Sequence, residues 1–279
     1  MTSAEPLAPA ATDLPAASRE QSVLRLRAGV TTGAVDHLAE EVPVALVYNG
    51  ISHAVMMATP RDLEAFALGF SLTEAIIDNA AECYGIEVET GEAGVAVHLE
   101  IASRAFMALK ERRRSLTGRT GCGLCGVDSL DQVYRNLPAL ARPAPLARSA
   151  IVRALAGLKS EQPLNRLTGA THAAAWCGAD GELLIVREDV GRHNALDKVI
   201  GAMAGLKARD PGGFMLISSR VSVEMAQKTA MAGVATLVAV SAPTAAAIRL
   251  AEGCGMTVIA FARGEDFVCY AHPDGLLLD

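Results

Sequence analysis

Apolar positions in the second half of the chain fall into short continuous runs separated by segments of helical periodicity. The runs are "HAAAWC", "ELLIVRED", "FMLISS", "TLVAVS" and "MTVIAFA", and the first two flank a turn at Ala179-Asp180-Gly181. Helices are expected over residues 192–206, over residues 222–233 where Gly233 closes the helix, and between Ser241 and Gly253. Such alternation predicts an α/β fold with a mostly parallel sheet covered by helices on both faces.

The first half shows a different pattern, in which strands come in pairs. Two apolar runs on either side of Asn49-Gly50 predict a hairpin, because both turn residues tolerate positive φ. Thr59 is a candidate N-cap and Pro60 a first helical residue, so a helix is expected from that point. The segments "GIEVET" and "AGVAVHLEI" predict a second strand pair, and residues 106–114 predict a short helix.

Composition divides the chain into four parts. Residues 1–22 are rich in alanine and proline and lack periodicity, so we expect a disordered tail. Residues 23–134 are expected to form a smaller N-terminal α+β lobe that ends in a mobile Cys-x-x-Cys loop. Residues 135–149, rich in proline and alanine, are expected to connect it to a C-terminal α/β lobe of residues 150–279 carrying the ligand-binding loops.

Charge and hydropathy exclude several classes of protein. The 279 residues are 51% hydrophobic but only 4% aromatic, so aliphatic side chains must fill the core. The net charge of −6 argues against general affinity for nucleic acid or anionic membranes. Neither a membrane span nor a secretory signal is expected, and six irregularly spaced cysteines indicate a reducing cytoplasm. One local exception to the acidic average is a basic cluster: Lys110, Arg112, Arg113, Arg114 and Arg119.

The glycine-rich stretch "RTGCGLCG" contains the most informative residues, Cys122 and Cys125. A structural zinc site needs two further ligands at typical spacing, and the sequence offers no second pair, so no zinc is expected. A dithiol oxidoreductase usually places its cysteines at a firm helix start, which glycine disfavours here. A sulfur carrier needs a mobile, reachable thiolate, and nearby guanidinium groups favour that form. The sulfur carrier fits these residues better, while a dithiol oxidoreductase or a chaperone with structural cysteines remains an alternative.

Three polar segments follow predicted strands: "REDVGRHN", "SSRVS" and "FARGED". Open α/β sheets bind ligands beyond the carboxyl ends of their strands, so these segments are candidate ligand loops. The first holds Arg192 and His193. The second places Ser219 and Arg220 near a helix N-terminus, which favours an anion. A purely structural role explains each of these two segments about as well as a ligand site does: a salt-bridged loop for the first, and a plain N-cap for the second. No Walker A run or G-x-G-x-x-G is present, so a nucleotide would be held differently.

Taken together, the motifs closely resemble those of the FdhD family of formate dehydrogenase accessory sulfurtransferases. The resemblance rests on "GCGLCG", "EDVGRHNALDKVIG", "SSRVSVEMAQK", "VSAPTAAAIRLAE" and "FARGEDFVCY", in that order, and covers about residues 40–272. It implies a cytoplasmic, usually homodimeric protein with a three-layer α/β/α, cytidine-deaminase-like fold. Such proteins take sulfur from a cysteine desulfurase and pass it to the molybdenum of a bis(molybdopterin guanine dinucleotide) cofactor, bound as a substrate. The catalytic subunit of formate dehydrogenase receives that cofactor.

The resemblance also implies residue roles. Cys122 would carry the persulfide and Cys125 would be its companion thiol. The resemblance places cofactor contacts at Phe261, Ala262, Arg263, Gly264, Glu265 and Asp266. From the position of the other two loops, further cofactor contacts are expected at Arg192, His193, Ser219 and Arg220. Nucleotide deaminases hold zinc with His-x-Glu and Pro-Cys-x-x-Cys, both absent here, so the fold resemblance carries neither zinc nor deamination.

Overall fold

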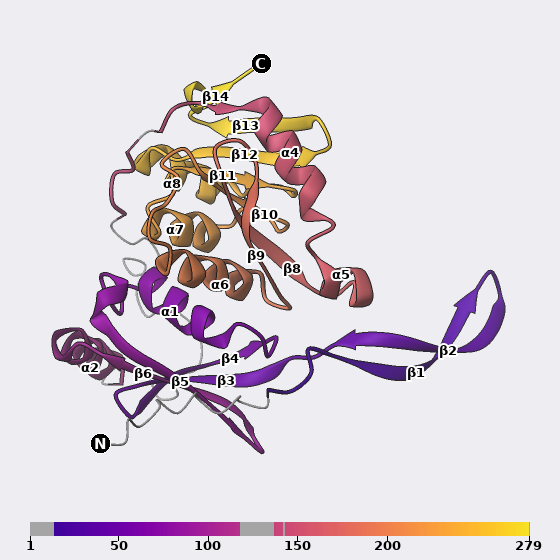
Figure 1. The fold of residues 1–279 in the computed structure, drawn as a ribbon, viewed down its shortest axis with the longest axis horizontal. Coiled ribbons are helices and arrows are strands. Elements are labelled where there is room, and N and C mark those ends of the chain that lie inside the picture. The colour runs from indigo at the N-terminus through magenta and orange to yellow at the C-terminus, as the bar shows by residue number, and fades with distance from the viewer. Residues whose placement is uncertain (1–13, 118–136, 142, 279) are drawn as a thin grey trace, which may run out of the picture.

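A computed structural model of the chain describes residues 14–117, 137–141 and 143–278. Two lobes are stacked on each other, and a two-stranded arm projects from their junction (Figure 1). Each lobe has its own buried core: one apolar cluster fills the N-terminal lobe, and two clusters lie on the two faces of the C-terminal sheet. Within the described residues no helix combines the length and apolar character needed to cross a bilayer.

The N-terminal lobe is a four-stranded sheet in the order β4-β3-β6-β5, with helices on one face. β3 and β6 are parallel, whereas β3–β4 and β5–β6 are antiparallel, so both predicted strand pairs are confirmed. The turn between β3 and β4 contains Asn49, whose φ of 44° is the positive value expected there. The elements are β3 (Val42–Tyr48), β4 (Ile51–Ala58), α1 (Leu63–Thr73), the 3-10 turn η1 (Ala80–Glu82), β5 (Cys83–Gly91), β6 (Gly94–Ile101) and α2 (Ser103–Thr117).

The C-terminal lobe is a six-stranded sheet in the order β13-β12-β11-β10-β8-β9. Helices α6, α7 and α8 pack on one face and α4 on the other, so the predicted three-layer α/β/α arrangement is confirmed. The main elements are α4 (Arg148–Leu158), α5 (Pro163–Thr168), β8 (His172–Cys177), β9 (Leu183–Asp189), α6 (Arg192–Ala204), β10 (Phe214–Ile217), α7 (Val223–Met231), β11 (Thr236–Ala239), α8 (Ala245–Cys254), β12 (Thr257–Arg263) and β13 (Asp266–Ala271). Smaller ones are β7 (Leu146–Ala147), η2 (Pro273–Gly275) and β14 (Leu276–Leu277).

The prediction of a mostly parallel sheet is wrong. β10–β11 and β11–β12 are parallel, but β8–β9, β8–β10 and β12–β13 are antiparallel. A strand buried on both faces is a continuous apolar run whatever the direction of its neighbour, so the pattern could not distinguish the two. Because β8 is antiparallel to both β9 and β10, the strands β9 to β12 still share one direction. Their carboxyl ends therefore meet at one edge of the sheet.

The prediction of a disordered tail over residues 1–22 is wrong from Ser18 onward. β1 (Ser18–Arg27) pairs with β2 (Val30–Ala39) along its whole length to form the projecting arm. The arm forms despite the polar sequence of β1 because backbone pairing with β2 satisfies its hydrogen bonds. Residues 1–13 lie outside the described residues. The predicted connection also ends earlier than residue 149, since α4 already begins at Arg148.

The two lobes are joined where α1 crosses α6 (Figure 1). A methyl group built on Gly69 would lie 1.8 Å from the carbonyl oxygen of Asp197, and one on Gly201 would lie 1.9 Å from that of Ala65. The two helix backbones are therefore in direct contact, which only glycine allows at these positions. This close crossing fixes the N-terminal lobe against α6, the helix whose first turn carries Arg192 and His193.

Candidate functional site

The three candidate loops lie at one edge of the C-terminal sheet, as predicted. Arg192 and His193 follow β9, Ser219 and Arg220 follow β10, and the segment from Phe261 closes β12. From β9 to β12 there are four strand intervals, or about 19 Å at the usual strand spacing. The loops therefore share one edge without converging on a point, an arrangement that suits an extended ligand.

Arg192 and His193 form the first turn of α6 and have unused hydrogen-bonding capacity. Arg192 Nε and His193 Nε2 are buried, and neither has a hydrogen-bond partner among the described residues. Burial, followed by the positive charges of Arg192 and Lys228, lowers the pKa of His193 to about 4. Near neutral pH the imidazole is therefore uncharged, and Arg192 supplies the positive charge. Buried polar atoms are normally paired, so these two indicate a place where a polar ligand group fits.

His172 is a residue of this edge that sequence reasoning missed. It begins β8 directly opposite Asp189, the last residue of β9. Burial and then Arg192 lower the pKa of His172, although Asp189 opposes the shift. The signal in the sequence was a histidine at the head of the predicted strand "HAAAWC". Its position at the functional edge depends on β8 running opposite to its neighbours, which the pattern did not reveal.

Much of the motif "EDVGRHNALDKVIG" joins the two lobes instead of facing a ligand. Asp189 and Lys198 form a fully buried ion pair with 2.7 Å between Oδ2 and Nζ. Lys198 Nζ also donates to the Thr59 carbonyl at 2.9 Å, and the Thr59 N–H donates to Asp189 at 3.0 Å. Asn194 Nδ2 donates to Asp189 and to the carbonyl of Met57 in β4. These contacts between lobes hold the α6 N-terminus, and thus Arg192 and His193, in place.

The same contacts correct the predicted start of α1. The helix begins at Leu63 and is preceded by Asp62 in the left-handed conformation, with a φ of 53°. Thr59 is not the N-cap, because its backbone and hydroxyl are used by the C-terminal lobe: its Oγ1 accepts from the N–H of Val190 at 3.2 Å. A polar residue ahead of an apolar period is the usual sign of a cap, but here it serves a tertiary contact.

A second buried ion pair lies behind His193. Lys228 Nζ contacts Asp197 at 2.8 Å and Glu74 at 3.0 Å, and it donates to Thr73 Oγ1 at 2.9 Å. Burial lowers the pKa of Lys228, but the two carboxylates outweigh it and raise the pKa overall. The ammonium group therefore stays charged next to the candidate site and helps to keep His193 neutral.

In the second loop only one of the two predicted residues is free to meet a ligand. Ser219 is buried, and its hydroxyl donates to the carbonyl oxygen of Arg220 at 3.2 Å. Arg220 itself is exposed. The sequence predicted Ser219 near the N-terminus of the helix, but the N-cap of α7 is Ser222, three residues further on. Arg220 is the residue of this loop that can attract an anion.

The third segment is a hairpin and not an open loop. Arg263 ends β12 and pairs with Asp266 at the start of β13, with Gly264 and Glu265 between them. Gly264 has a φ of 59°, the left-handed conformation that such a turn requires. Glu265 is paired with Arg148 of α4 at 2.8 Å, so its carboxylate is already engaged. Arg263 and Asp266 are exposed at the sheet edge.

Phe261 and Ala262 lie in an irregular part of β12 just before this hairpin. The register of β12 with β13 shifts between Ala260 and Arg263, and Phe261 has a φ of 52°. A bulky residue in the left-handed region is strained and is often found at functional sites. The side chain of Phe261 is exposed, whereas Ala262 is fully buried in the core. Of these two predicted contacts, only Phe261 can meet a ligand through its side chain.

Cys122 and Cys125, the predicted persulfide carrier and its companion thiol, lie outside the described residues. Description stops at Thr117, the end of α2, and resumes at Leu137. Within the basic cluster, Lys110 lies over the ring of Phe106 and Arg112 donates to the carbonyl oxygens at the end of α1. These two side chains have partners within the N-terminal lobe. The remaining side chains of the cluster are not described: Arg113, Arg114 and Arg119.

The chain is similar to known proteins over nearly its whole length. A family model described as the FdhD/NarQ family matches residues 39–277. A relative named sulfur carrier protein FdhD, from Cupriavidus necator, is 57% identical over 91% of this chain and 88% of its own length. A second of the same name, from Bordetella petrii, is 51% identical over 95% and 97%. A crystal structure from Desulfotalea psychrophila, whose description names a formate dehydrogenase accessory protein, shares the fold. Its TM-score is 0.75 at 24% identity, covering 94% of this chain and all of the other.

Proposed function

The chain belongs to the FdhD/NarQ family, and from this we propose that it is a sulfur carrier for formate dehydrogenase. It accepts sulfur from a cysteine desulfurase as a persulfide on Cys122. It then transfers that sulfur to the molybdenum of a bis(molybdopterin guanine dinucleotide) cofactor, which is its substrate. The carrier is thus a sulfurtransferase, and it works in the cytoplasm, where reducing conditions keep both thiols available.

The observation that carries the proposal is the family match, because residues 39–277 include both cysteines and all three loops. The names of the relatives that are 57% and 51% identical support the sulfur carrier role. The description of the Desulfotalea psychrophila structure supports formate dehydrogenase as the enzyme that is served. At the sheet edge, the buried nitrogen atoms of Arg192 and His193 that have no partner in the described part of the chain support the binding of a large polar ligand.

Loading of Cys122 is a thiol–persulfide exchange. The Cys122 thiolate attacks the outer sulfur of the desulfurase persulfide, a new S–S bond forms on Cys122, and the desulfurase cysteine leaves as a thiolate. The transferred sulfur keeps its oxidation level, so the step needs neither an oxidant nor a reductant. Arginines near Cys122 in the sequence favour the attacking thiolate.

Delivery breaks the persulfide bond that loading formed on Cys122. The S–S bond breaks, Cys122 is left as a thiolate, and the reduced metal of the cofactor supplies the two electrons that convert the transferred sulfur to sulfide. Cys125 offers a second course for a persulfide that is not delivered. Its thiol attacks the inner sulfur of the Cys122 persulfide, forms a Cys122–Cys125 disulfide and releases hydrogen sulfide.

The described residues supply the binding part of this function. Arg192 and Arg220 provide positive charge for the phosphates of the cofactor, and neutral His193 can donate one hydrogen bond. Exposed Phe261 and Arg263 are about 19 Å along the edge from β9. That span suits the nucleotide arms of the cofactor, which are extended, better than a small substrate.

The proposal is tested by intact-mass measurement after incubation with a cysteine desulfurase and free cysteine. Wild type and Cys125→Ala should each gain about 32 Da per sulfur atom accepted, and Cys122→Ala should not. Treatment with dithiothreitol should remove the added mass. Loading of Cys122→Ala to the wild-type level would contradict the proposal. Loss of loading in both variants would instead favour a dithiol oxidoreductase, and full support of formate dehydrogenase by the double variant would favour a cofactor-binding chaperone.

A further inference from the structure

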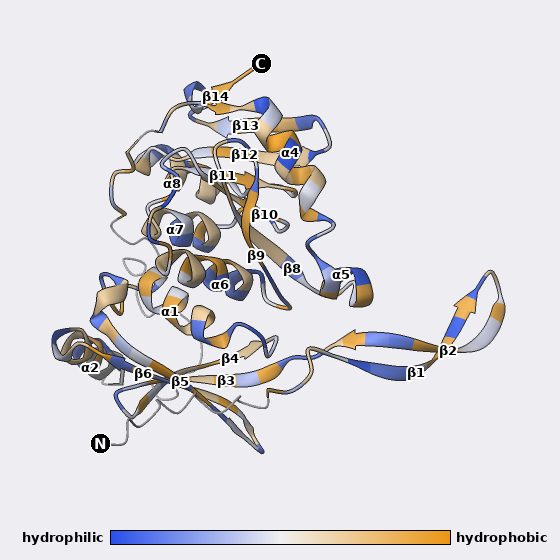
Figure 2. Ribbon diagram, in the orientation of Figure 1, coloured by the Kyte–Doolittle hydropathy of each residue, from blue (hydrophilic) through white to orange (hydrophobic). Residues whose placement is uncertain are grey.

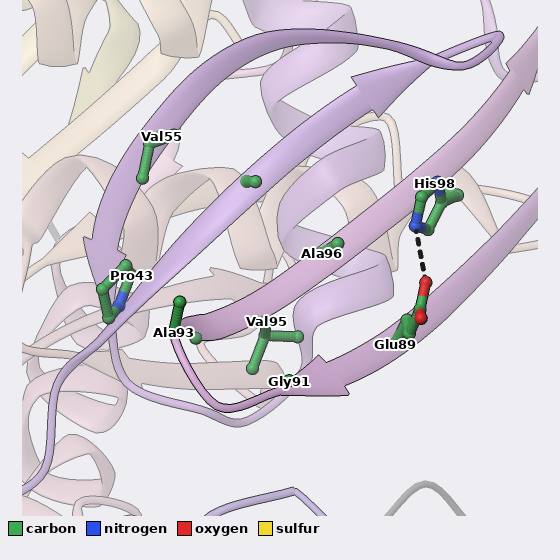
Figure 3. Close-up of a pocket in the computed structure, with 10 residues that line it drawn as sticks. Pro43, Val55, Glu89, Gly91, Ala93, Val95, Ala96 and His98 are labelled. Carbon is green, nitrogen blue, oxygen red and sulfur yellow. Dashed lines mark hydrogen bonds and ion pairs between the residues drawn. The ribbon is translucent and has the colours of Figure 1, made fainter.

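A small cavity in the C-terminal lobe differs in chemistry from a larger one in the N-terminal lobe. The larger cavity, of about 460 Å³, lies on the face of the N-terminal sheet that points away from α1 (Figure 3). Its wall is mostly apolar, and its two ionisable side chains, Glu89 and His98, pair with each other at 3.2 Å. The smaller cavity, of about 130 Å³, has polar groups in its wall that are not paired in this way. It is therefore the stronger candidate for a ligand site.

The smaller cavity, which we call the basal cavity, lies where β8 ends and β10 and β11 begin. Its wall contains Trp176 near the end of β8, Gly213 just before β10 and Ala235 just before β11. Arg209 and Asp210 line it from the segment between α6 and β10. The candidate loops lie at the opposite end of β10 and of its neighbours. The basal cavity is therefore separate from the proposed cofactor site.

The indole of Trp176 supplies a hydrogen-bond donor that is not used. Trp176 is 3% exposed, and its Nε1 is buried without a partner among the described residues. The adjacent strand β10 has apolar side chains throughout (Figure 2), so it offers no side-chain acceptor. A methyl group built on Gly213 would lie 2.4 Å from Trp176 Cζ2, the ring carbon two bonds from Nε1, so this part of the ring meets the cavity wall. Because a buried indole N–H is normally paired, it indicates a place for a ligand oxygen.

Arg209 and Asp210 carry opposite charges that do not neutralise each other. Arg209 is exposed, and its Nη1 donates to the carbonyl oxygen of Ala232 at 2.8 Å, which leaves other guanidinium N–H groups for a ligand. Asp210 accepts from the backbone N–H groups of Ala179 at 2.7 Å and Gly212 at 2.9 Å. Neither side chain forms an ion pair within the described ranges. The cavity therefore has one cation and one anion without a charged partner.

We propose that the basal cavity binds a small α-amino acid such as alanine. The carboxylate of the amino acid accepts from Arg209 and from the Trp176 N–H, and its ammonium group donates to Asp210, whose two oxygens each have a lone pair left. Pro143 and Pro211 add apolar wall that suits a short side chain. A simple anion would use only half of the site, because it would leave Asp210 without a cation.

The size of the basal cavity restricts the ligand further. Its volume of about 130 Å³ is roughly four times the volume that one water molecule occupies in the liquid. A nucleotide or an aromatic amino acid is therefore too large, whereas alanine and amino acids of similar size fit. Ligand size thus separates the basal cavity from the functional edge, where an extended ligand is expected.

Fluorescence of the full chain tests the proposal directly. Trp176 is the only tryptophan in the sequence, so its emission reports on this cavity alone. Titration with L-alanine at constant ionic strength should give a saturable change, and calorimetry should give the same dissociation constant. Acetate and ethylamine each carry one of the two charged groups and should bind at least about 10-fold more weakly. L-phenylalanine should give no binding heat, because its side chain does not fit.

Substitutions of the two charged residues give the second part of the test. Arg209→Gln and Asp210→Asn should each raise the dissociation constant for L-alanine at least about 10-fold. Lys207→Gln is the matched control, because Lys207 is an exposed cation of the same segment that does not line the cavity. It should bind L-alanine as wild type does. Urea denaturation shows that each variant is folded, and Arg209→Gln, which alters an exposed side chain, should be as stable as wild type.

Three outcomes would overturn the proposal. The first is the absence of a saturable signal by both methods, which would leave the cavity to water. The second is acetate binding as tightly as L-alanine, since the site would then hold any small anion. The third is equal affinity of Arg209→Gln and wild type for L-alanine. Persulfide loading on Cys122 should be the same in all these variants, so a failure of the sulfur carrier function would appear in that assay and not in the L-alanine titration.

Discussion

Replacing Gly201 with alanine should weaken the joint between the lobes. The added methyl group would lie 1.9 Å from the carbonyl oxygen of Ala65 and 2.8 Å from the backbone nitrogen of Gly69. A carbon–oxygen contact normally settles near 3.3 Å, so α1 would have to retreat by roughly 1.4 Å. Both contact atoms belong to a helix backbone, so no side-chain rotation can relieve the clash.

The expected loss follows from two opposing effects. Overpacking of this kind costs about 1 to 3 kcal/mol, and the forced separation also disturbs the buried hydrogen bonds between Thr59, Asp189 and Lys198. Alanine recovers up to about 1 kcal/mol through its higher helix propensity. The loss from the disturbed hydrogen bonds, about 1 kcal/mol, offsets the gain in helix propensity, so we expect Gly201→Ala to lower the free energy of unfolding by roughly 1 to 3 kcal/mol.

Urea denaturation followed by circular dichroism measures this difference, with Gly253→Ala as the matched control. Gly253 also lies in a helix, but nothing lies within 4 Å of the position where its methyl group would be. The same substitution there should be neutral or stabilising by up to about 1 kcal/mol. If Gly201→Ala unfolded at the same urea concentration as wild type, or if both variants lost stability equally, the reasoning about the helix crossing would be refuted.

Three further predictions concern charges at the joint and the edge. Lys198→Met leaves Asp189 buried without its charged partner and should cost about 3 to 5 kcal/mol of unfolding free energy. Adding Asp189→Asn removes the charge but keeps an oxygen for the N–H donors of Gly191 and Asn194, so it should restore part of the loss; a double variant less stable than Lys198→Met would contradict this. Burial, then nearby positive charge, lowers the pKa of His193 to about 4, whereas an unfolded histidine has a pKa near 6.5. As the pH is lowered from 6.5 to 4, the unfolded state therefore binds the proton first, and the free energy of unfolding should decrease. His193→Gln should remove about 1 to 2 kcal/mol of that fall, after discounting for solvent screening, and an unchanged pH profile from urea titrations at pH 7.5 and 4.5 would refute it. Arg220→Gln should weaken binding of guanosine diphosphate about 10-fold by calorimetry without changing stability, whereas Arg153→Gln, remote on α4, should not; equal losses would contradict a local role.

Local signals were sufficient for much of the fold. The hairpin at Asn49-Gly50, the turn before β9 and the glycine that follows α7 are each encoded by residues whose backbone preferences act over two or three positions. The alternation of buried strands and helices likewise identified the three layers. These features could be predicted because they depend on neighbours in the sequence.

Features that depend on distant partners could not be predicted. Thr59 looks like a helix cap, yet its position is determined by Asp189 and Lys198, which lie 130 and 139 residues further along the chain. The same holds for the motif "EDVGRHNALDKVIG", in which adjacent residues divide between two tasks. Arg192 and His193 face the functional edge, whereas Asn194 and Lys198 bind the other lobe. Periodicity does not separate these tasks, because both require polar residues on the same helix.

The candidate site shows the same division. The sequence predicted that all three loops lie at one edge of the sheet. That prediction needs only that the strands before the loops, β9, β10 and β12, run in the same direction, whatever their order in the sheet. It could not tell that Ser219 and Glu265 use their polar groups within the fold, or that Phe261 is held in a strained conformation. Those outcomes depend on exact backbone geometry, which residue type alone does not specify.

If sulfur reaches the cofactor through Cys122, transfer of labelled sulfur from the chain to formate dehydrogenase will show it. The chain is loaded with ³⁵S by a cysteine desulfurase, freed of donor, and mixed with formate dehydrogenase that contains unsulfurated cofactor. We expect label to leave the chain and appear in the enzyme, and formate oxidation to rise with it. Cys122→Ala should deliver none. Activation of formate dehydrogenase by Cys122→Ala, or activation without movement of the label, would contradict it.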